Sequence, residues 1–127
     1  MTGTNPESPS TGVSRAALIS NHVVRTFSEY TGRGPTKAWT SLDGDLVTVV
    51  LQDTLTKGER RLVADGRSEI VLDMRRAFQE TMRTDLVAGV EEILDRRVDA
   101  FLSGNHIDPD VAVETFVLAP RPTGPAA

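Results

Sequence analysis

Apolar residues recur along the chain with helical and with strand-like spacing, and the two patterns predict helices and strands in a definite order. An apolar stripe with intervals of three and four residues predicts an amphipathic helix over 14–30. A longer stripe predicts a second helix over 68–96, which would be on the order of 40 Å long. Between them, Thr56-Lys57-Gly58-Glu59 has the form of a capping box, which predicts a short helix that ends near Gly66.

Two pairs of apolar, valine-rich runs predict β-hairpins. The first pair, 37–42 and 46–51, is joined by Asp43-Gly44-Asp45, and an Asp-Gly pair favours a tight turn. The second pair, 98–103 and 111–118, is separated by a polar loop over 104–110. The sequence therefore predicts an α+β fold in which a four-stranded antiparallel sheet carries its helices on one face.

Similarities between the two halves indicate an internal α-β-β repeat. Trp39 and Phe101 each lie early in the first strand after a helix, and both are predicted to be core residues. The long helix would extend beyond a sheet of six-residue strands, so its remaining apolar surface predicts a homodimer through this helix. Residues 1–12 and 120–127 are rich in glycine, proline, serine and threonine and predict disordered tails, which leaves one domain over 13–119.

Composition and charge exclude several classes of function. The 127 residues carry a net charge of -4 and no cysteine, which argues against nucleic-acid binding and excludes thiol chemistry. The sequence has no secretory signal and no apolar run near the ~20 residues that span a bilayer, so a cytoplasmic protein without direct membrane insertion is expected. The spacing of His22 and His106 fits no common zinc motif, and neither a metal nor a cofactor is predicted.

The strongest candidate for a ligand site is the turn Gly32-Arg33-Gly34-Pro35, together with Lys37. Glycine lets the backbone approach a ligand closely, Arg33 can bind a carboxylate, bicarbonate or phosphate with its fork of donors, and Lys37 adds a second positive charge. The alternative is structural: Gly32 closes the first helix, Pro35 prevents its continuation, and both cations are solvated.

A second candidate is the polar loop that contains Asn105 and His106. A histidine near Asp108 and Asp110 can act as an acid or base, although the same residues also form ordinary turns around a proline. The arginines at 75, 76 and 83 alternate with acidic residues along the long helix and are expected on an exposed face.

The chain resembles the MpsC-like family, a family of small bacterial domains named for a component of a sodium-translocating, membrane-potential-generating system. The resemblance covers about 19–120 and rests on residues 32–38, on Arg76-Ala77-Phe78, and on residues 100–103 with the Asn105-His106 and Asp108-Pro109-Asp110 motifs. It implies association with a membrane ion or inorganic-carbon uptake system whose other components are larger proteins, and it supplies no catalytic residues.

These observations favour a non-enzymatic accessory or regulatory subunit that docks on a larger membrane-associated partner and binds a small anion. The expected ligand-binding residues are Gly32, Arg33, Gly34, Pro35, Lys37, Asn105 and His106. The alternative is a small enzyme acting on an anionic substrate, in which His106 is the acid or base and Arg33 holds the substrate. That alternative requires the two turns to meet in space, since an acid or base must reach its substrate.

Overall fold

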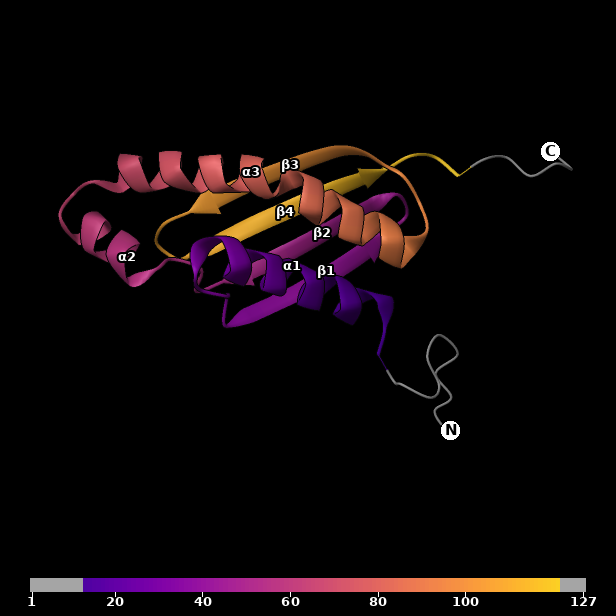
Figure 1. Ribbon diagram of the computed structural model, residues 1–127, viewed down its shortest axis with the longest axis horizontal. Coiled ribbons are helices and arrows are strands. Elements are labelled where there is room, and N and C mark those ends of the chain that lie inside the picture. Colours follow the sequence, from indigo (N-terminus) through magenta and orange to yellow (C-terminus); the bar gives the residue numbers. More distant parts are fainter. Residues whose placement is uncertain (1–12, 122–127) are drawn as a thin grey trace, which may run out of the picture.

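The computed structural model describes residues 13–121, and its elements follow the predicted order (Figure 1). From the N-terminus they are α1 (Arg15–Thr31), β1 (Lys37–Asp43), β2 (Leu46–Gln52), α2 (Lys57–Ala64), α3 (Ser68–Leu94), β3 (Val98–His106) and β4 (Val111–Leu118). The predicted tails, 1–12 and 120–127, lie outside the described residues except for 120 and 121.

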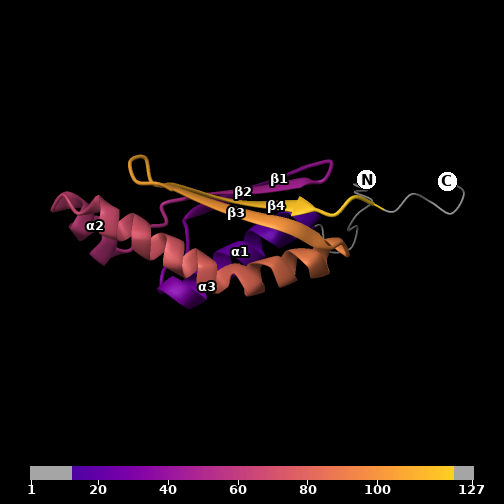
Figure 2. The same ribbon diagram turned by 90° about the horizontal axis from the view of Figure 1, so that it is seen from above.

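The strands form one antiparallel sheet in the order β1-β2-β4-β3, with α1 and α3 side by side on the same face (Figure 2). The predicted α+β fold is confirmed. Each hairpin supplies one edge strand and one central strand, and β2 pairs with β4 in the middle of the sheet. Each half thus contains a helix, an edge strand and a central strand, which agrees with an internal α-β-β repeat to which α2 is an addition.

Local side-chain signals set the ends of the first two helices. The Ser14 hydroxyl accepts a hydrogen bond from the Ala17 amide at 3.1 Å and caps α1. At the other end Gly32, with φ of 82°, closes the helix in the left-handed region that favours glycine. Thr56 and Glu59 form the predicted capping box of α2. These bounds therefore follow from contacts within a few residues.

Strand β3 is longer than predicted, because residues 104–106 continue it instead of belonging to the loop. They pair with Val113, Ala112 and Val111 of β4. On the helix side of the strand, the amides of Asn105 and Gln79 of α3 exchange two hydrogen bonds, at 2.7 and 3.2 Å. The polar residues of this segment predicted a loop, but Asn105 can belong to a strand because Gln79 of the distant helix α3 satisfies its amide.

The hydrophobic core lies between the sheet and the helices α1 and α3. Burial of this apolar surface stabilises the fold by roughly 25 cal/mol per Å². Phe101 of β3 is half-buried beside it, with its ring 5.1 Å from that of Phe116. The buried members of the core are Ile19, Val23, Phe27, Val47, Val49, Leu51, Met82, Leu86, Val90, Leu94, Ala112, Phe116 and Leu118.

The prediction that Trp39 is a core residue is wrong: 49% of its surface is exposed. Its neighbour Thr40 faces α1, where its hydroxyl lies 2.8 Å from that of Ser20. Because successive side chains of a strand point to opposite faces, Trp39 lies on the other side of the sheet. Within residues 13–121 no helix covers that face, which we call the open face (Figure 2).

The long helix α3 has 27 residues, and most of its apolar stripe is buried within the chain. The stripe packs against the sheet and α1, and α2 contacts α3 at its N-terminal part. Arg75, predicted to be exposed, belongs to this stripe and is only 2% exposed. The buried positions of the helix are Val71, Arg75, Gln79, Met82, Leu86, Val90 and Leu94.

The helices α1 and α3 lie close together at Gly89, and this contact leads to a testable prediction. A Cβ added to Gly89 would lie 2.1 Å from the His22 ring, which itself contacts the Leu86 carbonyl oxygen at 3.2 Å. Gly89→Ala is therefore expected to lower the free energy of unfolding by about 1–3 kcal/mol, as overpacking does. Urea denaturation measures this change.

The control for this prediction is the same substitution in a His22→Ala background. There the ring that the added methyl group would meet is absent, and alanine should stabilise the helix by up to about 1 kcal/mol relative to glycine. A stabilising effect of Gly89→Ala in the presence of His22 would contradict the close contact.

No helix among residues 13–121 combines the length and the apolar character that a membrane crossing requires.

Candidate functional site

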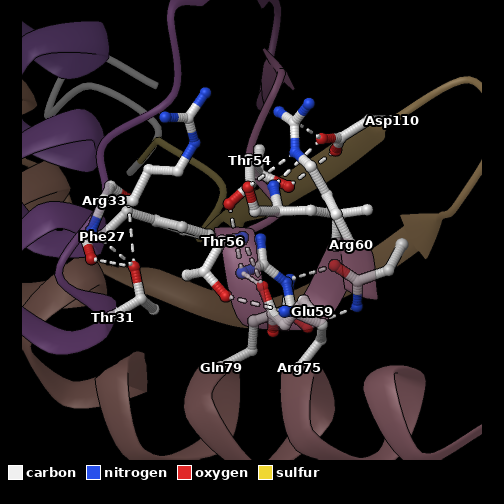
Figure 3. A network of polar contacts seen from close by, with 12 residues as sticks. Phe27, Thr31, Arg33, Thr54, Thr56, Glu59, Arg60, Arg75, Gln79 and Asp110 are labelled. Carbon is white, nitrogen blue, oxygen red and sulfur yellow. Dashed lines mark hydrogen bonds and ion pairs between the residues drawn. The ribbon is translucent and has the colours of Figure 1, made fainter. Parts of the chain in front are cut away.

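Three segments that are distant in the sequence meet at one end of the sheet. They are the α1–β1 turn, the β2–α2 linker and the end of the β3–β4 loop (Figure 3). An ion pair of 2.6 Å joins Arg33 of the turn to Asp53 of the linker. Asp53 in turn donates its amide hydrogen to the carbonyl oxygen of Asp110 at 3.1 Å. We call Arg33, Asp53, Lys57, Arg60 and Asp110 the surface site.

Short-range contacts hold the α1–β1 turn in place. The Thr31 hydroxyl donates to the Phe27 carbonyl at 2.8 Å and accepts from the Arg33 amide at 3.3 Å. Gly34 lies close to α1, since a Cβ there would stand 3.4 Å from the Val24 side chain. Pro35 is buried. Gly32, Gly34 and Pro35 thus shape the turn that presents Arg33.

Asp110 fixes the linker from the other side. Its carboxylate accepts hydrogen bonds from the Thr54 hydroxyl at 2.9 Å and from the Leu55 amide at 3.0 Å. The same carboxylate lies 4.0 Å from Arg60 of α2. The linker is therefore held on both sides by charged residues of distant segments.

Asp53 is the acceptor that the cations of the surface site share. Arg33 and Arg60 both form ion pairs with its carboxylate. Loss of solvent contact would by itself raise the pKa of Asp53, but hydrogen bonds from Arg33, Thr36 and Arg60 outweigh this effect and lower the pKa below its ordinary 3.8. Asp53 is therefore ionised at neutral pH.

Next to this ion pair lies a hollow of about 310 Å³ with an excess of positive charge. Arg33, Lys57 and Arg60 line it together with Asp53 and Leu55, so three cations face one carboxylate. The Nε of Arg33 is buried and has no hydrogen-bond partner within the described residues. Such an arrangement can accept a small anion, because arginine offers several N–H donors and one carboxylate does not use all of them.

The structure separates the predicted ligand residues into three places: the α1–β1 turn, the open face, and the helix side of β3, where Asn105 contacts Gln79. Arg33 belongs to the surface site, whereas Lys37 lies on the open face in a row with Gln52, Val111 and His106. Three strand spacings separate the backbones of Lys37 and His106, roughly 14 Å. The Nδ1 of the exposed His106 ring contacts the Pro109 carbonyl oxygen at 2.9 Å. The enzyme alternative, in which His106 and Arg33 act on one substrate, stays a prediction.

Beneath the surface site lies a group of connected polar side chains, which we call the buried network. Four of its members are buried, Glu59, Arg75, Gln79 and Glu114, and they contact the half-buried Asn105 and the exposed Ser103. In Figure 3, Arg75 and Gln79 extend from α3 toward Glu59 of α2. The Nη1 of Arg75 lies 3.4 Å from the Glu59 carboxylate and 3.5 Å from the Thr54 carbonyl oxygen. Because Thr54 also binds Asp110, it connects the network to the surface site.

Glu114 is the most deeply buried acid of the network, with 0% of its surface exposed. Its carboxylate accepts hydrogen bonds from Gln79 at 2.7 Å and from the Ser103 hydroxyl. Burial raises the pKa of Glu114 from its ordinary 4.5 to about 7, although Ser103, Gln79 and the charge of Arg75 act in the opposite direction. Its protonation state therefore changes near neutral pH.

The burial of Arg75 and Glu114 was not predicted from the sequence, although the periodicity of their elements contains the signal. Arg75 is four residues from Val71 and from Gln79, within the apolar stripe of α3. Glu114 alternates with Ala112 and Phe116 along β4, so the period of two assigns it to the buried face. Treating the charge of Arg75 as evidence of exposure concealed its position. The surface site gave no such signal, because Asp53, Arg60 and Asp110 meet Arg33 only in the folded chain.

A family model described as Na+-translocating membrane potential-generating system (MpsC) matches residues 12–120, a range that contains every described helix and strand. No curated protein and no solved structure gave a significant match.

Proposed function

Because the chain belongs to the MpsC family, we propose that it is a non-enzymatic accessory subunit of a membrane ion or inorganic-carbon transport system. Family membership supports an association with a sodium-dependent membrane-potential system. In this proposal the chain is a cytoplasmic subunit that docks on a larger membrane-associated protein and responds to a small anion.

The observation that carries the proposal is the cationic hollow of the surface site. Arg33, Lys57 and Arg60 line the hollow. The two carboxylates of the surface site, Asp53 and Asp110, offset two of these charges, and one positive charge stays in excess. Bicarbonate, phosphate and small carboxylates match the planar fork of arginine, so they form the expected class of ligand. Arg33 is the one residue that was predicted from the sequence to bind a ligand and that also lines this hollow.

The hollow also has the position that a regulatory ligand needs. Arg33 belongs to the α1–β1 turn, Arg60 belongs to α2, and Asp53 links both to the β3–β4 loop through Asp110. An anion that binds both arginines competes with Asp53 for their donors. Such a ligand would change the relative stability of these contacts, which is how a bound anion can alter a docking surface.

Thermal unfolding against a panel of anions tests the proposed site. Bicarbonate, phosphate, acetate and a nucleotide are compared at equal ionic strength. An anion that binds the site should stabilise the chain by about 2.7 kcal/mol when its concentration is 100 times its dissociation constant. This stabilisation raises the Tm by several degrees. Arg33→Ala and Arg60→Ala should each abolish the shift relative to their own baseline.

Arg61→Ala is the matched control, because Arg61 is the exposed neighbour of Arg60 on α2 and does not line the hollow. It should keep the full shift. An equal shift in all three variants would place the anion elsewhere, and no shift with any anion in the unsubstituted chain would remove the ligand from the proposal.

A further inference from the structure

The open face of the sheet carries an apolar surface that nothing within residues 13–121 covers. Its position follows from the pairing register, since the residues that alternate with buried Val49 and Glu114 point away from the helices. Three of its large side chains are substantially exposed: Trp39 at 49%, Leu46 at 42% and Leu102 at 58%. The apolar members of this face are Trp39, Leu46, Val50, Ala100, Leu102, Val111, Val113 and Val117.

We propose that the open face is the interface of a homodimer, in which two copies stack their sheets about a two-fold axis that runs across the strands. Stacked sheets pack about 10 Å apart, with side chains from the two inner faces in contact. This axis lies in the plane between the sheets and places each strand above the same strand of the second copy, running in the opposite direction.

Charge is self-complementary in this arrangement. Lys37 and Asp43 lie at opposite ends of β1, six residues apart, and therefore on the same face. Reversal of the strand places Lys37 of one copy above Asp43 of the other, and the two-fold axis forms this pair twice. Both side chains are exposed in the single chain, so pairing requires no rearrangement of the core.

Side-chain size is complementary in the same arrangement. On β1 the large Trp39 of one copy would lie above the small Ser41 of the other. On β3 the exposed Leu102 would lie above Gly104, which has no side chain. Large residues that face small ones allow two sheets to interdigitate. The open face is therefore complementary, in both shape and charge, to the same face of a second copy.

The area of the face is sufficient for a specific dimer. Four strands about 4.8 Å apart, each about eight residues long, present roughly 500 Å² of flat surface per copy. Two copies would bury about 1,000 Å², the lower limit of specific interfaces. The outer side of α3 is less suitable for a dimer, because it carries exposed charges such as Asp73 and Arg76, and Ile70 is its one large hydrophobic residue with a substantially exposed surface among those described.

Sedimentation equilibrium of the full chain with matched variants tests this proposal. The unsubstituted chain should have the mass of a dimer at micromolar concentrations. Leu102→Glu, on the open face, should halve the mass, whereas Ile70→Glu, on α3, should leave it unchanged. Both residues are exposed, so circular dichroism should show the same secondary structure for both variants. A monomeric unsubstituted chain overturns the proposal and leaves the open face to a different protein partner.

Exchange of the β1 charges tests the orientation of the axis. Lys37→Asp and Asp43→Lys should each weaken the dimer at least tenfold, because two like charges then face each other at both ends of β1. The double variant, Lys37→Asp with Asp43→Lys, should restore the dissociation constant to within about threefold. Dissociation by Leu102→Glu without rescue by the double variant would overturn the antiparallel stacking. Dissociation by Ile70→Glu but not by Leu102→Glu would assign the dimer to α3.

Discussion

Replacement of Arg75 by alanine is expected to lower the free energy of unfolding by about 3–5 kcal/mol, the loss typical of a broken buried ion pair. Its guanidinium is 2% exposed, pairs with Glu59 at 3.4 Å and lies 5.7 Å from the centre of the Phe27 ring. Without Arg75, the carboxylate of Glu59 stays buried without its counter-charge, and a charge inside the protein is costly when it is unpaired. Urea denaturation at constant pH measures the loss.

Arg76→Ala is the matched control for this prediction. Arg76 is the next residue of α3, its side chain is 66% exposed, and its partner Asp73 is also on the surface. Exposed ion pairs contribute about 0–1 kcal/mol, so this variant should unfold near the midpoint of the unsubstituted chain. Arg75→Lys should recover part of the loss, because it restores the charge but not the planar fork. Equal midpoints for Arg75→Ala and Arg76→Ala would contradict the buried ion pair.

The stability of the chain is expected to decrease as the pH rises from about 4.5 to about 7, because of Glu114. Burial raises the pKa of its carboxyl in the folded state, so the folded chain binds more protons than the unfolded chain in this window. The proton stabilises the fold below the unfolded pKa, and this stabilisation is lost as the pH passes the folded pKa. A shift from 4.5 to about 7 corresponds to about 3 kcal/mol.

Glu114→Gln isolates this contribution. Glutamine has nearly the shape of the protonated acid and can still accept from Gln79, but it does not titrate. The variant should match the unsubstituted chain near pH 4.5 and exceed its stability by about 3 kcal/mol above about pH 8. Urea denaturation across this range provides the comparison. If both proteins lost stability with the same slope, another group would be responsible.

The lowered pKa of Asp53 acts in the opposite direction and at a lower pH. Its ion pairs with Arg33 and Arg60 stabilise the folded chain above the ordinary pKa of 3.8, and they are lost as the pH falls below it. The two effects are therefore separable by pH. Glu114 changes the stability of the chain between about pH 4.5 and 7, whereas Asp53 changes it below its ordinary pKa of 3.8.

The sequence by itself determined the elements and the fold class, because their signals are local. The stripe of α1, the Asp43-Gly44-Asp45 turn and the capping box at Thr56 each depend on residues within a few positions of one another. Together with the family resemblance, these patterns predicted the α+β fold and the MpsC family correctly.

Only the tertiary structure decided which side chains face one another. Asp53, Arg60 and Asp110 meet Arg33 because β2 ends, and α2 and β4 begin, at the same end of the sheet. Trp39 is exposed because the two faces of the sheet are not equivalent: α1 and α3 cover one of them. Periodicity assigns a residue to a face, but the packing of distant elements decides whether that face is buried, and that packing also placed Arg75 and Glu114 in the interior.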